Sequence, residues 1–444
     1  MATKTLKAQK RIRQQLAHLI QRFYRLERAG RKFIPGKTKV RYSGGFFGEQ
    51  EVTAMLNTIL DGWLGLSVVG EKFENRLAAY LRAPYTLATN SGSAATLLTM
   101  AALTSRLRPD PLRPGDEVVT PACTFATTVA AIVHQGLVPR FVDVELATLN
   151  PTVEHLAAAI NKKTRAILIP HTLGNPNDMP KVMKLAREHK LYVVEDNCDG
   201  LGSEFNGKKT GSFGHLGAES FYPAHHLTTG GEGGAVIIND HEFYKIVMTL
   251  RNWGRGCWCL ASEKHPLGAC RNRFNYTLEG NIPVDHRYYF SELGYNLKLT
   301  EAQAAMGIVQ LRRFPKMAQR RRDNFKSLYG FFKHYEKFFY LPTSLPQADP
   351  CWFAFPLTLR EKVPFSRNEI LAYLEEKRIE GRSLFAGNIT RHPALRGVNY
   401  RVSGSLKNSD QVLKQTFFVG VWPGIGAREM AYMKEIFIDY LKRF

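Results

Sequence analysis

The stretch Val193-Val194-Glu195-Asp196-Asn197-Cys198-Asp199 joins an apolar segment directly to a group of acidic residues. Short apolar runs like this one recur on both sides of it, and helical patterns separate them. We predict strands at 85–89, 117–120, 137–144, 165–170, 191–196 and 234–238, with helices near 93–105, 125–134, 153–160, 180–189 and 241–252. This alternation is typical of βαβ units and predicts an α/β fold, in which helices cover both faces of a mostly parallel sheet.

The pattern divides the chain into three parts. Residues 1–41 form a basic amphipathic N-terminal arm, and residues 42–310 form the large α/β domain. Residues 311–444 form a smaller α+β domain, which begins with a basic helix at 312–335. Ligands of such sheets bind beyond the carboxyl ends of the strands. The residues that follow the predicted strands are therefore the candidates for a functional site.

Length and composition exclude several classes of protein. The 444 residues are 44% hydrophobic and 11% aromatic, which argues against a disordered chain. The sequence has no uninterrupted run of about 18 apolar residues and no apolar segment before a cleavage site, so we expect neither a membrane span nor a secretory signal. Six cysteines are too few for a disulfide scaffold and indicate a reducing compartment. We expect a soluble, cytoplasmic protein.

The positive charge is concentrated in the arm. Residues 1–41 contain 13 basic residues and one acid, and so carry +12 of the chain's net charge of +22. Apolar residues recur on one helical face of the arm, at Ile12, Leu16, Leu19, Ile20 and Phe23. We favour a helix that docks on the protein body, with contact to an acidic redox partner or to an anionic membrane surface as the alternatives. No nucleic-acid-binding motif accompanies the charge, so we expect no nucleic-acid partner.

Three motifs that follow predicted strands carry possible chemistry. Thr89-Asn90-Ser91-Gly92-Ser93 opens a helix with small residues, which let backbone amides approach an anion. Asp196 is placed to hold the protonated ring nitrogen of a pyridoxal-type cofactor, although a helix-capping role fits it equally well. In Ser220-Phe221-Tyr222-Pro223-Ala224-His225-His226, a base follows a hydroxyl group, and a glycine-rich turn follows at 230–234. This arrangement favours a functional histidine over a packed one.

Together the motifs resemble the DegT/DnrJ/EryC1/StrS aminotransferase family, a branch of the fold-type-I pyridoxal-phosphate enzymes, from about Gly45 to the C-terminus. The resemblance implies an aspartate-aminotransferase-like fold. Asn296 matches a family residue that reaches the phosphate of the neighbouring subunit, which implies a homodimer with shared sites. The other implied cofactor-binding residues are Gly92, Ser93 and Ser220 at the phosphate, Phe125 on the ring and Asp196 at the ring nitrogen.

The chain departs from the aminotransferase pattern at His225, where members of that family have a lysine. The lysine amine binds the cofactor covalently and allows turnover with an amino donor, and an imidazole cannot form that link. The site is therefore expected to hold pyridoxamine 5'-phosphate non-covalently. His225 is the expected general base, with Asp199 as the second catalytic candidate. The resemblance then implies dehydration of a keto sugar in place of transamination.

Four cysteines supply a possible electron carrier. Cys198, Cys257, Cys259 and Cys270 follow the spacing Cys-x58-Cys-x1-Cys-x10-Cys. Four thiolates can hold a [2Fe–2S] cluster; a structural zinc, without its usual paired Cys-x2-4-Cys steps, and four unrelated buried thiols are the alternatives. Dehydration leaves an adduct that needs two further electrons, and a cluster near the cofactor is suited to deliver them. The gap before Cys270 is about three residues longer than the family leads us to expect, so this ligand is the least secure.

Within the family, the lost lysine and the cysteines resemble the pyridoxamine-dependent iron–sulfur 3-dehydratases of 3,6-dideoxysugar and O-antigen synthesis. Matching stretches are 171–175, 195–202, 220–234 and 384–391. The resemblance implies a nucleotide-linked 4-keto-6-deoxyhexose as substrate, with CDP-4-dehydro-6-deoxy-D-glucose the expected one, and an NADH-dependent flavin and iron–sulfur reductase as electron donor. Substrate-binding candidates are His171, Arg382 and Arg391.

Three other functions are alternatives to this dehydration. An ordinary nucleotide-sugar aminotransferase requires a lysine at position 225, which the chain lacks. A metal-free pyridoxamine-dependent 3-dehydratase leaves the four cysteines without a purpose. A non-catalytic protein that binds the cofactor or the nucleotide sugar would not consume a 4-keto-6-deoxy nucleotide sugar.

Overall fold

The computed structural model describes residues 2–30, 32–258 and 274–444. Its centre is an eight-stranded sheet in the order β1-β9-β8-β5-β4-β2-β3-β16. Strand β9 is antiparallel to both of its neighbours, and the other pairs are parallel. The strands are β1 (Tyr85–Thr89), β2 (Glu117–Pro121), β3 (Val138–Val142), β4 (Thr164–Pro170), β5 (Tyr192–Asp196), β8 (Leu216–Ser220), β9 (Gly234–Ile238) and β16 (Arg401–Val402). The predicted mostly parallel fold-type-I sheet is confirmed.

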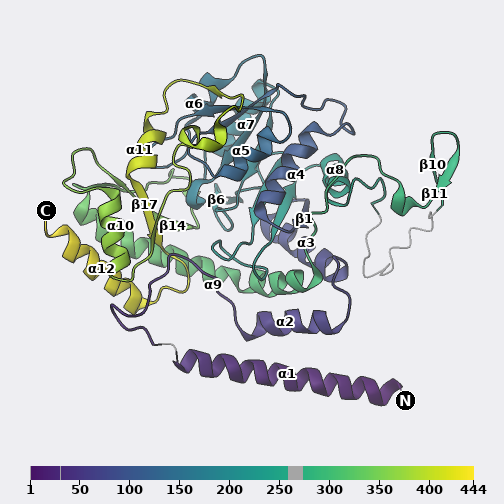
Figure 1. Ribbon diagram of the computed structural model, residues 1–444, viewed down its shortest axis with the longest axis horizontal. Helices are drawn as coiled ribbons and strands as arrows, with labels where there is room; N and C mark the ends of the chain where they lie inside the picture. Colours follow the sequence, from purple (N-terminus) through teal and green to yellow (C-terminus); the bar gives the residue numbers. More distant parts are fainter. Residues whose placement is uncertain (1, 31, 259–273) are drawn as a thin grey trace.

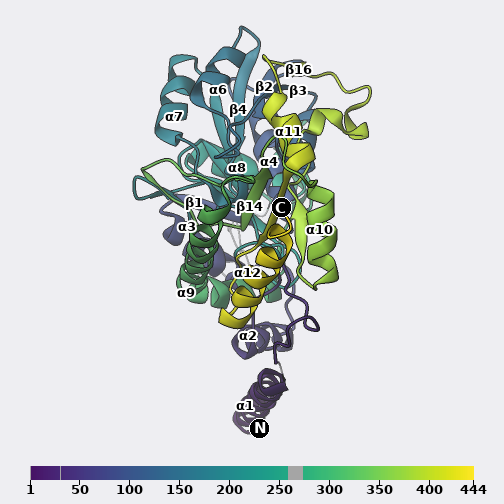
Figure 2. The same cartoon turned by 90° about the vertical axis from the view of Figure 1, so that its left-hand side faces the viewer.

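Helices cover both faces of this sheet (Figures 1 and 2). Val118 and Val194 belong to the core on the side of α4 and α8, whereas Val119 and Val193 belong to the core beneath α6 and α7. Neighbouring strand residues thus point to opposite faces, and β2 and β5 are buried on both. The helices are α3 (Val68–Leu81), α4 (Gly92–Thr104), α5 (Ala126–Val133), α6 (Val153–Ala159), α7 (Met179–Glu188) and α8 (His241–Arg251).

The sequence pattern predicts six of the eight strands of this sheet and does not predict β8 or the short edge strand β16. Gly217 and Glu219 interrupt the apolar run of β8, and both are explained by packing. A Cβ atom on Gly217 would lie 2.4 Å from the carbonyl oxygen of Gly211, so only glycine fits there. Glu219 is fully buried, Asn197 Nδ2 donates to its carboxyl group at 2.7 Å, and burial raises its pKa well above the usual range.

The C-terminal part is built around a long helix, α9 (Glu301–Phe332), which starts earlier than the predicted helix at 312–335. Thr300 and Gln303 form a capping box, in which each side chain accepts from the backbone N–H of the other. Because α9 begins at this cap, it runs continuously through the expected domain boundary at residue 310.

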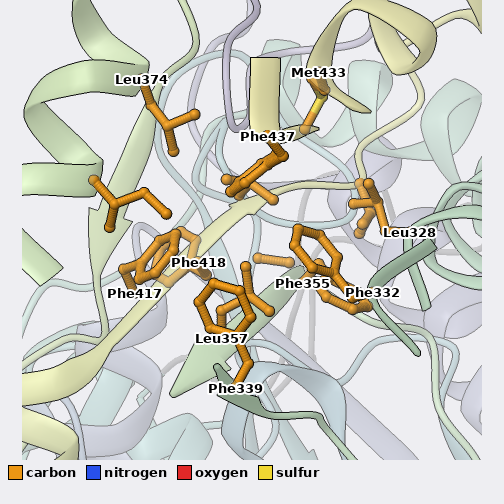
Figure 3. Packing of buried hydrophobic residues seen from close by; sticks show 14 of the residues in the cluster. Leu328, Phe332, Phe339, Phe355, Leu357, Leu374, Phe417, Phe418, Met433 and Phe437 are labelled. Carbon is orange, nitrogen blue, oxygen red and sulfur yellow. The ribbon is translucent and has the colours of Figure 1, made fainter. Parts of the chain in front are cut away.

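An antiparallel sheet in the order β12-β14-β17-β15 packs against α9. Its strands are β12 (Phe339–Tyr340), β14 (Ala354–Leu359), β15 (Gly381–Ser383) and β17 (Thr416–Gly420), and its helices are α10 (Arg367–Glu376), α11 (Lys407–Gln415) and α12 (Ala427–Leu441). Phenylalanines from four elements fill the core between them, among them Phe332, Phe355, Phe417 and Phe437 (Figure 3). Phe353, which precedes β14, Arg382 of β15 and Phe418 of β17 contribute to the site described below.

The N-terminal arm forms the helix α1 (Ala2–Gly30), as predicted, and a second helix, α2 (Glu49–Leu60), lies between it and the body (Figure 1). Within the described ranges, no helix combines the length and the apolar character that a transmembrane span needs.

Candidate active site

A cavity of about 300 Å³ opens at the carboxyl ends of the parallel strands, between the large sheet and the β14–β17 unit. The lining includes most of the residues singled out from the sequence: Gly92, Ser93, Phe125, His171, Asp196, Cys198, Asp199, Ser220, His225 and Arg382. Residues separated by almost 300 positions in the chain thus meet at one place. The position agrees with the general rule for ligand sites of parallel sheets.

The first turn of α4 forms one end of the cavity. Gly92 begins this helix, and Ser91 caps it by accepting from the N–H of Ala94 at 3.0 Å. A Cβ atom on Gly92 would lie 2.5 Å from Cβ and 2.8 Å from Oγ of Ser220, so glycine is required for Ser220 to approach the helix. Backbone N–H groups of a first turn lack helical partners and attract anions. With the hydroxyl groups of Ser93 and Ser220, they fit a phosphate group.

Asp196 occupies the floor of the cavity, at the end of β5. Oδ2 accepts a hydrogen bond from Thr128 Oγ1 at 2.7 Å, and Oδ1 accepts from the N–H of Cys198 at 3.2 Å. The side chain is therefore held in one orientation while facing the cavity. A carboxylate in this position fits a protonated pyridine nitrogen.

Phe125 offers an aromatic surface at the cavity. Its side chain is 53% exposed, although it precedes the buried helix α5, and it contacts the edge of Phe385 at a centroid distance of 6.0 Å. Such exposure of a large aromatic side chain beside a cavity fits stacking on a planar ring. The phosphate end, the carboxylate and this ring together fit pyridoxamine or pyridoxal phosphate.

His225 lies between the carboxylate of Asp199 and the ring of Phe353. Nδ1 is 3.3 Å from Asp199 Oδ1, an ion-pair distance without hydrogen-bond geometry. The Phe353 ring packs against the imidazole at a centroid distance of 5.4 Å. Asp199 is itself held by the N–H of Leu173, which donates to Oδ2 at 3.3 Å. The imidazole faces the cavity, where a substrate proton can reach it.

His226 has a different role from its neighbour. It is buried, and its Nε2 donates to the carbonyl oxygen of Cys351 at 2.6 Å. Burial, together with the nearby Arg321 cation, lowers its pKa well below the usual range. His226 is therefore neutral and structural, and His225 is the member of the pair that serves the cavity.

Arg321 of α9 is a residue that the sequence does not single out. It is 1% exposed, and it donates to the carbonyl oxygens of His225 at 2.9 Å and of Phe353 at 3.0 Å. Burial lowers its pKa to about 10, which still leaves the side chain charged at neutral pH. Arg321 therefore ties the backbone of the candidate base to the backbone of the ring that packs on it.

Replacement of Arg321 by methionine is expected to lower the free energy of unfolding by about 2 kcal/mol or more, because buried carbonyl groups lose their donors. Arg320→Met is the matched control. Arg320 is exposed on the same helix, so its loss should cost less than about 1 kcal/mol. Denaturant unfolding of the two variants measures the difference, and equal effects would contradict a special role for Arg321.

The substrate candidates divide into two groups. Arg382 lines the cavity, pairs with Glu380 and lies over the ring of Tyr42 at 5.2 Å. Arg391 is not among the lining residues. It is 61% exposed in its side chain and makes two bonds to Asp410, at 2.8 and 2.5 Å, so the structure gives it a place in an ion pair at the surface.

His171 lines the cavity but has both ring nitrogens engaged. Nε2 faces Glu195 Oε2 at 2.9 Å, and Nδ1 accepts from the N–H of Asn177 at 3.2 Å. Glu195 in turn accepts from the N–H groups of Gly211, Phe213 and Gly214. The side chain of His171 is thus fixed at the wall of the cavity by a buried network.

Asn296 lies outside the cavity lining and is exposed. Its backbone pairs with Asn252, close to the end of α8.

The four cysteines are described only in part. Cys198 lines the cavity, and its Sγ is 3.0 Å from where a Cβ atom of Gly92 would stand. Cys257 Sγ lies 3.0 Å from His286 Nδ1. Cys259 and Cys270 lie outside the described residues. Among the residues that the structure does describe, no three potential metal ligands gather at one point.

Sequence reasoning misses Thr128 of the large domain and Phe353 and Arg321 of the smaller one. These residues carry no local motif, and they reach the site only through the packing of distant elements.

Two known proteins match almost the whole length of the chain. It is 40% identical over 432 residues to the lipopolysaccharide biosynthesis protein RfbH of Salmonella typhimurium, which covers 97% of this chain and 98% of the relative. It is 42% identical over 425 residues to dTDP-4-dehydro-2,6-dideoxy-D-glucose 3-dehydratase of Saccharopolyspora spinosa, which covers 95% of this chain and 91% of the relative.

A similar solved structure is that of the Escherichia coli GDP-4-keto-6-deoxy-D-mannose-3-dehydratase with bound hydrated pyridoxal phosphate. The TM-score is 0.79 at 26% identity, with 90% of this chain and 99% of the other covered. The model of the DegT/DnrJ/EryC1/StrS aminotransferase family matches residues 47–437. The chain therefore belongs to the DegT/DnrJ/EryC1/StrS aminotransferase family.

Proposed function

We propose that this protein is a pyridoxamine-phosphate-dependent 3-dehydratase that removes the C3 hydroxyl group of a nucleotide-linked 4-keto-6-deoxyhexose. The observation that carries the proposal is the position of His225. The imidazole stands in the cavity beside Asp199, Asp196 and Ser220, at the place where the family's aminotransferases have a lysine. Relatives that cover 95% and 84% of the chain, and a similar solved structure, are 3-dehydratases of keto-deoxy sugars by name.

The residues that line the cavity would have different roles in the proposed dehydration. A bound pyridoxamine phosphate would supply an amine that condenses with a ketone and a ring that withdraws electrons. Asp196 would keep the ring nitrogen protonated. His225 would act as general base, with Nδ1 oriented by Asp199 so that Nε2 accepts the proton. The imidazole forms no covalent bond to the cofactor. The proposed dehydration needs no such bond, whereas transamination depends on the lysine that forms it.

For the substrate we propose CDP-4-dehydro-6-deoxy-D-glucose, in the synthesis of a 3,6-dideoxysugar for O-antigen. Support comes from the 40% identity to a lipopolysaccharide biosynthesis protein. Arg382 is the candidate for a nucleotide phosphate, because a guanidinium group at the cavity wall suits that anion. His171 would shape the wall through its bond to Glu195.

The test is turnover of CDP-, dTDP- and GDP-linked 4-keto-6-deoxyhexoses with added pyridoxamine phosphate. The expected result is loss of the C3 hydroxyl group, which mass spectrometry of the sugar detects. The CDP-linked sugar should be the preferred substrate. Formation of an amino sugar from glutamate would show an aminotransferase instead. No consumption of any keto sugar, even with a reductase and NADH, would leave a binding protein.

We further propose that Cys198, Cys257, Cys259 and Cys270 hold a [2Fe–2S] cluster, which receives electrons from a separate NADH-dependent reductase with flavin and its own iron–sulfur centre. The support is the spacing of the cysteines and the position of Cys198 at the cavity. Desolvation and the Asp196 carboxylate raise the pKa of the Cys198 thiol.

Anaerobically purified protein is expected to contain about two iron and two sulfide ions per chain. Cys257→Ser should lose most of both, and with them the visible absorbance of the cluster. The control is Cys123→Ala, which removes a fully buried thiol outside the set and should leave the iron in place. Protein free of iron that still dehydrates the sugar would instead be a metal-free 3-dehydratase.

We also propose a homodimer. Asn296 is exposed and lies outside the cavity of its own chain, a position suited to the phosphate in a second copy's site. Light scattering at micromolar concentration tests the mass.

A further inference from the structure

Helix α1 lies along one edge of the molecule and is separated from the central sheet by α2 (Figures 1 and 2). Two ion pairs attach it there: Arg13 to Asp61 and Arg28 to Glu49, each at 2.8 Å. The half of α1 that faces the body is partly buried, and includes Leu16, Ile20 and Tyr24. The docking helix expected from the sequence is therefore present, but docking uses only part of its surface.

Most of the apolar residues of α1 remain uncovered. Ile12, Leu19, Phe23 and Leu26, which we call the apolar stripe, have exposed fractions of 53, 60, 62 and 65%. Their spacings of seven, four and three residues place them along one line of the helix. The apolar stripe thus runs beside the docked face and is exposed.

A row of cations accompanies the apolar stripe. Lys4, Lys7, Arg11, Arg22 and Arg25, which we call the basic stripe, are all exposed. Within the described part of the chain, none of the five forms an ion pair. Arg11, Arg22 and Arg25 directly precede Ile12, Phe23 and Leu26, and one residue turns an α-helix by about 100°. The two stripes are therefore neighbours on the outward half of α1.

An exposed apolar line beside a line of cations is the surface that an anionic lipid interface accepts, since apolar side chains enter the acyl boundary while the cations meet the headgroups. A second copy of this chain is a poorer occupant. The arm carries +12, and the other 403 residues carry +10, so any copy brings more positive charge toward the basic stripe. We propose that α1 attaches the protein peripherally to an anionic bilayer, lying in the plane of its surface.

The test uses the full-length protein and sedimentation with vesicles. Vesicles of phosphatidylcholine with 30 mol % phosphatidylglycerol are expected to bind the protein at least about tenfold more tightly than pure phosphatidylcholine, and the binding should weaken as salt rises. Leu19→Gln with Phe23→Gln, and separately Arg22→Gln with Arg25→Gln, should each lower the binding about tenfold or more. The matched control is Leu278→Gln with Ile282→Gln, two exposed apolar residues away from α1, which should leave it unchanged.

Three results would overturn the proposal. One is equal binding to neutral and anionic vesicles. Another is vesicle binding that the apolar-stripe variant does not weaken. Attraction between the basic stripe and negative charge alone would then explain the binding, and an acidic protein would satisfy the basic stripe equally well. The third is no vesicle binding, with a change of mass in light scattering for the apolar-stripe variant, which would assign the apolar stripe to an interface between copies. Circular dichroism of each variant confirms that the helix is retained.

Discussion

His225→Asn is expected to lower the rate of sugar dehydration by about 100- to 10,000-fold, the range that a positioned general base contributes. Asparagine keeps a polar side chain of similar size near Asp199 but cannot take up a proton at neutral pH. The measurement is single-turnover dehydration with bound pyridoxamine phosphate, so that reductase and product release do not enter the rate. Binding of the cofactor, followed by its absorbance, should change little, because His225 is not among the residues that hold the phosphate or the ring nitrogen.

The companion variant is His225→Lys, which puts an amine in the same place. It should also lose dehydration, and it should bind pyridoxal phosphate covalently, with the absorbance of a protonated imine after mixing. A His225→Asn protein with normal dehydration would contradict the assignment of the base. Normal dehydration by His225→Lys would contradict the argument that imidazole is what separates this chain from an aminotransferase.

Asp196→Asn is expected to weaken binding of pyridoxamine phosphate by about 10- to 100-fold. The carboxylate would make a charge-assisted hydrogen bond to the ring nitrogen, which contributes about 1.5–3 kcal/mol. Dehydration of the variant at saturating cofactor should also be slower, because an amide does not keep that nitrogen protonated. Cofactor titration followed by absorbance measures the first effect, and single-turnover kinetics at saturation measures the second.

Thr128→Val provides a graded comparison for Asp196. It removes the 2.7 Å bond from the threonine hydroxyl to Oδ2 but keeps the carboxylate and the shape of the side chain. The loss of one such bond should cost about 1 kcal/mol, a several-fold weaker affinity. If Asp196→Asn binds the cofactor as well as the unaltered protein, Asp196 is a turn residue and the orientation proposed for the ring is wrong.

Local sequence patterns account well for the frame of this protein. Short apolar runs give the strands at 85–89 and 165–170, because a strand buried on both faces needs apolar residues at successive positions. The strand β8 is an exception. Its Gly217 is required by the close approach of Gly211, and its Glu219 accepts a hydrogen bond from Asn197. Such neighbours are fixed by packing and leave no mark in the local pattern.

By itself, the sequence determined the type of sheet, the motifs at the ends of its strands and the presence of His225 in place of a lysine. Each of these features is carried by a short run of consecutive residues. Only the tertiary structure decided that His225 faces the cavity while His226 donates to Cys351, that Arg382 lines the wall while Arg391 pairs with Asp410, and that Arg321 braces the site. These choices depend on which distant elements come into contact. Burial and close packing of the whole chain set those contacts. Two adjacent histidines can therefore differ in burial, in hydrogen-bond partners and in access to the cavity.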